Sequence, residues 1–217
     1  MTLAFPLPLE VFFDRLPIQT MTLAPNASMA ISRTRGGDVM AAGIGTRLWR
    51  GEIHLDVMTD AEHRAIRPLI DLLLAPGASF LLTDRLRAAP RDDPRGAILG
   101  SATPRLRQIS ARELALKGLP PQYWLRRDDL LGFSYGANPT RHAFHRVVGE
   151  VRANASGDTA LFEVTPPVRA GAAVNVPVTL IRPACKAMIL PDTLERGATR
   201  AGGLTEGVSF RVQQLLR

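Results

Sequence analysis

The alternation of apolar and polar residues is clearest in "RLWRGEIHLDV", residues 47–57. Trp49, Ile53, Leu55 and Val57 fall on one face, whereas the even-numbered positions between them carry Arg, Glu, His and Asp. A period of two is typical of a half-buried antiparallel strand. We therefore predict a strand whose apolar face belongs to a core.

The preceding stretch, "SMAISRTRGGDVMAAG", contains two strand-like runs on either side of Gly36 and Gly37. Glycine accepts the positive φ angles that tight hairpin turns require. The pattern therefore predicts two strands joined by a turn at the glycine pair.

Residues 60–74 predict one principal helix. Thr59 can cap its N-terminus, and Glu62, three residues later, completes a capping box. Pro68 removes one N–H from the helical ladder, so we expect a kink there or a later start. The helix should pack against the strand at 47–57 through an apolar stripe. The stripe consists of Ile66, Leu69, Ile70 and Leu73.

Short apolar runs separated by Gly, Pro, Asn and Asp turns recur between residues 106 and 183. Such close spacing predicts a small all-β barrel. The chain ends in another alternating strand, "VSFRV", which lacks obvious partners within that pattern. We therefore expect residues 1–105 and 184–217 to form one β-rich domain, with 106–183 inserted as the barrel. The predicted fold class is mainly β with one principal helix, a β-rich α+β fold.

Composition limits the function classes. The 217 residues are 46% hydrophobic, enough for one large core or two small ones, and no apolar run is long enough to span a bilayer. The N-terminal stretch has no basic region and contains Glu10 and Asp14, so we do not expect a signal peptide. Cys185 is the only cysteine, which excludes an internal disulfide.

The net charge of +7 comes almost entirely from arginine. Arginine recognises phosphate, so a nucleic-acid-binding barrel is one hypothesis. The arginines are scattered along the chain, however, without a dense run or interleaved aromatic residues. We therefore favour a compositional bias as the explanation of the arginine content.

The stretch "RHAFHRVVGEV" places His142 and His145 three residues apart. Its valines and phenylalanine predict a strand, on which residues three apart point to opposite faces. The sequence has no third ligand at a suitable spacing, so we expect a strand with polar decoration rather than a zinc site.

Two further features could support a hydrolase. Ser134 lies in a G-x-S-x-G string, but no helical pattern follows it, as a nucleophile elbow would need. Asp128 and Asp129 are adjacent, and adjacent side chains on an extended chain point apart, so they should form a polar turn. We predict no catalytic, cofactor-binding or metal-binding residues, and a protein that is not an enzyme.

Three stretches are similar to tail proteins of long-tailed bacteriophages. The first is "LWRGEIHLDVMTDAEHRAIRPLIDLLLAPGASFLLTD", a strand–helix–strand unit. The second contains "HRVVGEV", "GDTALFEV", "PPVR" and "AGAAVNVPVTL", the last expected as a closing strand. The third is the ending, "FRVQQLLR". The chain most resembles the distal tail protein, although Asp128 and Asp129 stand where that family has "GD".

This resemblance implies a structural role. A distal tail protein forms a homo-hexameric ring that connects the tail tube protein to the baseplate hub and other tail-tip proteins, while DNA only passes through the channel. It implies a tube-like β-sandwich domain with an inserted OB-like barrel, no cofactor and no membrane insertion. The location would be the virion tail tip, after assembly in the host cytoplasm. The alternatives are another minor tail or hub protein, a small hydrolase or a nucleic-acid-binding barrel.

A ring needs contacts between two different surfaces of each subunit. Residues 84–105 form a polar segment with too few apolar residues to fold alone, so we expect a neighbouring subunit to order it. The loop around the glycine pair is a second candidate, at a subunit contact or at the channel wall. The candidate contact residues are Arg33, Arg35, Asp38, Arg85, Arg87, Arg91, Asp92, Asp93 and Arg95.

Overall fold

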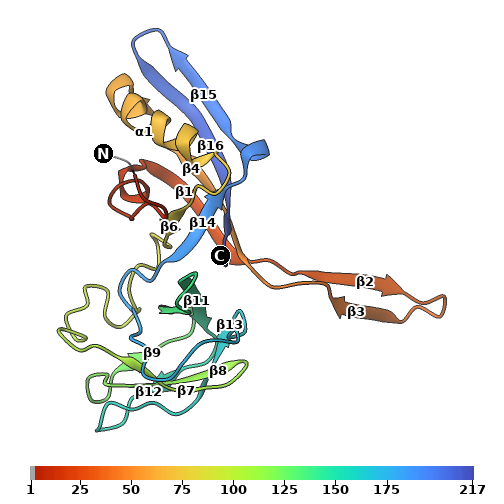
Figure 1. Ribbon diagram of the computed structural model, residues 1–217, viewed down its shortest axis with the longest axis vertical. Coiled ribbons are helices and arrows are strands. Elements are labelled where there is room, and N and C mark those ends of the chain that lie inside the picture. The colour runs from red at the N-terminus through yellow and green to blue at the C-terminus, as the bar shows by residue number, and fades with distance from the viewer. Residues whose placement is uncertain (1–2) are drawn as a thin grey trace.

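The computed structural model describes residues 3–217 and is mainly β (Figure 1). It has a single α-helix in that range, and one of its sheets curls into a half-barrel, which confirms the β-rich α+β prediction. Two short 3-10 turns are also present, η1 (Phe13–Arg15) and η2 (Pro191–Thr193).

The main sheet combines strands from both ends of the chain. Its strand order is β1-β4-β16-β14-β6, and both β5 and β15 also pair with β16. Every one of these pairings is antiparallel. The long strand β16 therefore joins the C-terminal segment to the N-terminal half. The strands are β1 (Ile18–Pro25), β4 (Trp49–Leu55), β5 (Met58–Thr59), β6 (Phe80–Leu82), β14 (Cys185–Ile189), β15 (Glu195–Arg200) and β16 (Leu204–Gln214).

The helix α1 (Asp60–Leu73) begins where the capping box predicted. The Thr59 N–H donates to the Glu62 carboxylate at 2.8 Å, and the Glu62 N–H donates back to the Thr59 hydroxyl at 3.4 Å. Pro68 lies inside the helix without delaying its start, so of the two expected effects the later start is wrong and the kink stays a prediction.

The strand and the helix stripe belong to one hydrophobic core, whereas their direct contact stays a prediction. Trp49, Ile53 and Leu55 share one core with the helix stripe, in which Leu69 is only partly buried. Val57 lies beyond the end of β4 and is 51% exposed, so its predicted place in the apolar face is wrong.

A smaller sheet occupies the middle of the chain, with the strand order β10-β11-β13-β8-β7. The segment expected as a closing strand forms only isolated bridges, at Pro177 and Thr179, so that expectation is wrong. The strands are β7 (Arg105–Ile109), β8 (Glu113–Lys117), β10 (Leu130–Tyr135), β11 (Arg141–Val147) and β13 (Phe162–Thr165). A separate pair consists of β9 (Trp124–Leu125) and β12 (Val151–Arg152).

The two sheets meet at a buried junction. The rings of Trp49, on β4, and Phe144, on β11, pack edge to face with centroids 4.9 Å apart. The Trp49 indole N–H donates to the Phe144 carbonyl at 2.7 Å. Leu130 and Phe144 belong to the core of the main sheet although they lie within 106–183. The exact domain boundaries therefore stay a prediction.

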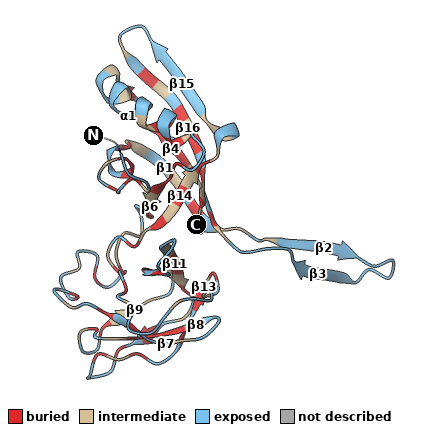
Figure 2. Cartoon of the chain, in the orientation of Figure 1, coloured by how far each residue is buried: buried red, intermediate tan, exposed pale blue. Residues whose placement is uncertain are grey.

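A two-stranded hairpin, β2 (Met29–Arg33) and β3 (Val39–Gly43), projects away from both sheets (Figure 1). Figure 2 shows that its strands are exposed throughout, whereas burial is concentrated in the strands of the two sheets. The hairpin therefore contributes little to the core of either sheet.

Candidate functional site

The hairpin turn forms at the predicted glycine pair. The Thr34 N–H donates to the Asp38 carbonyl at 2.9 Å, and the Gly37 N–H donates to the Thr34 carbonyl at 3.0 Å. Gly37 has φ of 93°, a conformation that side chains with a Cβ rarely adopt. The prediction of two strands around this turn is confirmed.

The hairpin continues the pairing of β1 with β4. Between the two ladders, the Asn26 N–H donates to the Leu48 carbonyl at 2.8 Å, and the Ile44 N–H donates to the Ser28 carbonyl at 3.1 Å. These bonds connect the β1–β4 ladder with the β2–β3 ladder, so the two chain segments leave the main sheet as one long antiparallel ribbon.

One face of this hairpin carries apolar side chains, with Arg33 opposite Val39 at its outer end. The strand register places Met29, Ile31 and Val39 on the same face, where Ile31 is 62% exposed and Val39 is 60% exposed. Met40 is equally exposed on the opposite face. Clustered exposed apolar residues are typical of interaction sites. The sequence-based choice of contact residues included only charged side chains and missed these, although the apolar positions of the two runs would have indicated them.

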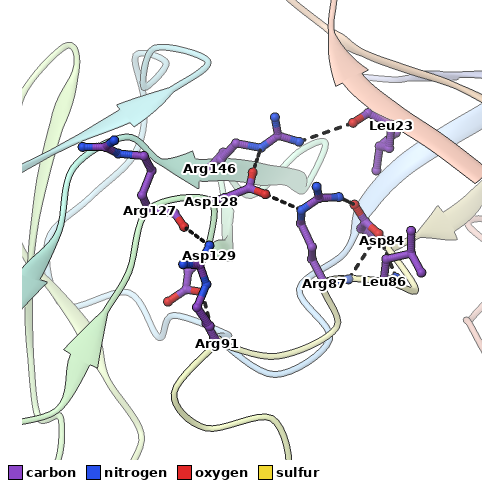
Figure 3. Close-up of polar contacts among 9 residues, drawn as sticks. All are labelled: Leu23, Asp84, Leu86, Arg87, Arg91, Arg127, Asp128, Asp129 and Arg146. Atoms are coloured by element: carbon purple, nitrogen blue, oxygen red, sulfur yellow. Dashed lines mark hydrogen bonds and ion pairs between the residues drawn. The ribbon is translucent and has the colours of Figure 1, made fainter.

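Asp128 lies at the centre of an ion-pair network between the two sheets (Figure 3). One carboxylate oxygen pairs with Arg87, and the other lies 2.8 Å from Nε of Arg146, on β11. Arg87 also pairs with the buried Asp84 at 3.2 Å. Arg146 reaches the main sheet, where it donates to the Leu23 carbonyl at 3.4 Å. The network therefore joins the segment after β6 to both sheets.

Asp129 points away from Asp128, as the sequence predicted for adjacent residues. Its carboxylate accepts the backbone N–H groups of Arg91 at 2.8 Å and Arg126 at 2.7 Å. Burial raises the pKa of Asp129, although these two N–H groups act in the opposite direction. The two aspartates form the polar turn before β10, and their carboxylates have separate partners.

Residues 84–105 are ordered by their own chain. The buried Asp93 carboxylate accepts the N–H groups of Ile98 at 3.0 Å and Leu99 at 2.8 Å, and the hydroxyl of Tyr123 at 3.2 Å. Asp92 pairs with Arg126 at 2.8 Å. Burial acts to raise the pKa of Asp93, but the backbone N–H groups outweigh it and lower the pKa. The expectation that a neighbouring subunit must order this segment is wrong, because buried carboxylates anchor it internally.

The candidate contact residues fall into two separate regions. Arg33, Arg35 and Asp38 are exposed at the tip of the hairpin, on the far side of the molecule from residues 84–105 (Figure 1). Arg85 donates to the Leu16 carbonyl at 3.0 Å within the chain, and Arg95 is exposed. Asp93 is buried and presents no contact surface in this chain.

The two histidines diverge as predicted, but His145 does not face solvent. Its Nδ1 lies 2.7 Å from the Pro166 carbonyl, and its ring stacks on Phe133. Burial lowers the pKa of His145 to about 4. His145 is therefore buried and not part of the polar decoration expected for this strand, because its ring packs against Phe133 of β10.

Ser134 and His142 lie opposite each other on β10 and β11. The Ser134 hydroxyl is 3.3 Å from Nδ1 of His142. Burial, with a contribution from the charge of Lys186, lowers the pKa of His142. Among the described residues, no carboxylate forms an ion pair with His142, so the arrangement lacks the orienting third group of a catalytic triad.

Comparison with known protein families and with curated proteins found no match. No helix within residues 3–217 is long and apolar enough to cross a bilayer. In the same part of the chain, no three or more histidine, cysteine, aspartate or glutamate side chains are grouped to hold a metal ion.

Proposed function

We propose that this chain is a structural subunit of a phage tail-tip ring, a distal tail protein that connects the tail tube to the baseplate hub. Its partners are other copies of itself in a homo-hexamer, the tail tube protein and the hub. DNA passes through the ring without being bound.

The observation that supports this proposal is the exposed hairpin, β2 and β3. An isolated two-stranded hairpin is marginally stable in water. All ten residues of the two strands are exposed, and an apolar face with Ile31 and Val39 is left in solvent. Contact with another molecule removes that apolar area from water and stabilises the hairpin.

The geometry of the hairpin suits a ring. A closed ring uses one surface of each subunit against a different surface of the next. A projecting element provides the first kind of surface, and the body of the neighbouring copy provides the second. The charged tip, with Arg33, Arg35 and Asp38, would set the register of that contact more than its affinity.

Assembly of the purified protein tests this function. Negative-stain electron microscopy should show rings, and light scattering should give a mass six times the 23.6 kDa of the chain. A double variant, Ile31→Asp with Val39→Asp, should remain monomeric because a buried contact cannot hold two unpaired carboxylates. The matched control is Val174→Asp, because Val174 is as exposed but lies outside the hairpin. Normal rings from the double variant would mean that the hairpin does not hold the ring together. If the wild-type protein stayed monomeric at every concentration, the proposal of a ring would be wrong.

The contact between Ser134 and His142 favours one competing function, a small hydrolase. A survey with activated ester substrates distinguishes the two. Ester hydrolysis that is lost in Ser134→Ala would support the hydrolase, whereas the structural role predicts equal background rates for wild type and variant.

A further inference from the structure

A groove of about 470 Å³ lies at the base of the hairpin. One wall is formed by the inner ends of the hairpin, residues 27–29, 41–43 and 45–47. The other wall is the turn after β13, residues 166–169, which belongs to the smaller sheet. Small and apolar residues dominate the lining, among them Ala41, Ala42 and Val168. An extended chain can approach such a surface closely.

The only charged side chains in the lining are two arginines, Arg47 and Arg169. The two arginines lie on opposite walls, and the side chain of each reaches across to the other wall. Arg47 donates to the Thr165 hydroxyl at 3.4 Å, and Arg169 donates to the Thr46 hydroxyl at 3.4 Å. Neither arginine forms an ion pair with any carboxylate of the described chain, although nine other arginines do. Each guanidinium therefore keeps N–H donors for a ligand.

The charge of a third arginine, Arg141, acts on Arg169. Arg141 has a buried Nε without a hydrogen-bond partner in the described chain. Burial lowers the pKa of Arg169; Tyr135 acts to raise it, and the charge of Arg141 acts to lower it. Like charges gathered without a counter-ion cost free energy, and an anion in the groove would relieve that repulsion.

We propose that this groove binds an acidic, extended peptide segment of a partner protein, with Arg47 and Arg169 pairing to its carboxylates. The apolar floor would receive the alternate side chains of that segment. The lining contains no aromatic residue on which a base could stack, which favours a peptide over single-stranded nucleic acid. This binding site does not depend on ring assembly.

Fluorescence anisotropy with a labelled heptapeptide of alternating glutamate and leucine tests the site. The wild-type protein should bind it at least about tenfold more tightly than the same peptide with glutamine in place of glutamate, because charge-assisted bonds are lost. Arg169→Gln should weaken binding of the glutamate peptide by about tenfold or more, and Arg169→Lys by less. The control is Arg112→Gln, because Arg112 is exposed, outside the lining and free of ion pairs in the described chain. It should leave binding unchanged.

The peptide comparison uses wild-type protein, so it stands even if a variant fails to fold. Equal affinity for the glutamate and glutamine peptides would overturn the proposal. So would tight binding that Arg169→Gln leaves unchanged while its melting temperature matches wild type. Tighter binding of a single-stranded oligonucleotide, lost in Arg169→Gln, would assign the groove to nucleic acid instead. Because the hairpin double variant leaves both arginines in place, loss of rings and loss of peptide binding are separate results.

Discussion

Three leucines of α1 allow burial to be tested with the chemistry held constant. Leu73 is 1% exposed in the main core, Leu69 is partly buried beside it, and Leu72 is 37% exposed on the outer side of the helix. Each can be replaced by alanine, which removes the same atoms and favours the helix equally at all three positions.

The expected losses of stability follow the burial. Truncating a fully buried leucine costs about 3–5 kcal/mol, because transfer free energy is lost and a cavity remains. Leu73→Ala should therefore lower the free energy of unfolding by about that amount. Leu69→Ala should cost about 1–2 kcal/mol because less apolar area leaves water there, and Leu72→Ala should cost under about 1 kcal/mol.

Urea unfolding followed by circular dichroism at the helix band measures these differences. For a chain of this size, 1 kcal/mol corresponds to about 2–4 °C in melting temperature, so Leu73→Ala should melt about 6–20 °C below wild type. If Leu73→Ala were no less stable than Leu72→Ala, the stripe would not face the core. The placement of α1 on the core that it shares with β4 would then be incorrect.

Two further predictions concern buried polar groups. The pKa of His145 is about 4 in the folded chain and about 6.5 when unfolded. Between these values the unfolded state binds the extra proton, so stability should fall as pH drops from 6.5 to 4, by up to about 3 kcal/mol. Urea titrations should show a shallower fall for His145→Asn, and equal pH slopes would contradict the burial of this histidine. Asp93→Asn should lower the free energy of unfolding by about 2–4 kcal/mol, because an amide cannot accept all three hydrogen bonds. Asp92→Asn, which loses one exposed ion pair, should cost under about 1 kcal/mol, and equal losses in the same urea assay would contradict the anchoring role of Asp93.

Features that depend on neighbours in the chain were predictable from the sequence. The cap at Thr59 and Glu62, the turn at Gly37 and the alternation in β4 each result from interactions within a few residues. Side-chain direction repeats every two residues in a strand, so the sequence alone showed that Trp49 and Ile53 share a face. The same reasoning separated Asp128 from Asp129 and His142 from His145.

Only the tertiary structure decided what those faces meet. Local alternation does not show that the small sheet covers His145, or that the Asp93 carboxylate anchors a segment that looked too polar to fold. It also does not show that the hairpin lies in solvent while β4 is buried, because both have alternating or apolar positions. Arg47 and Arg169 are 122 residues apart and meet only because the hairpin base and the turn after β13 line one groove. Burial and ion pairing depend on segments that are distant in sequence, and the hydrophobic pattern of one segment does not specify its partner.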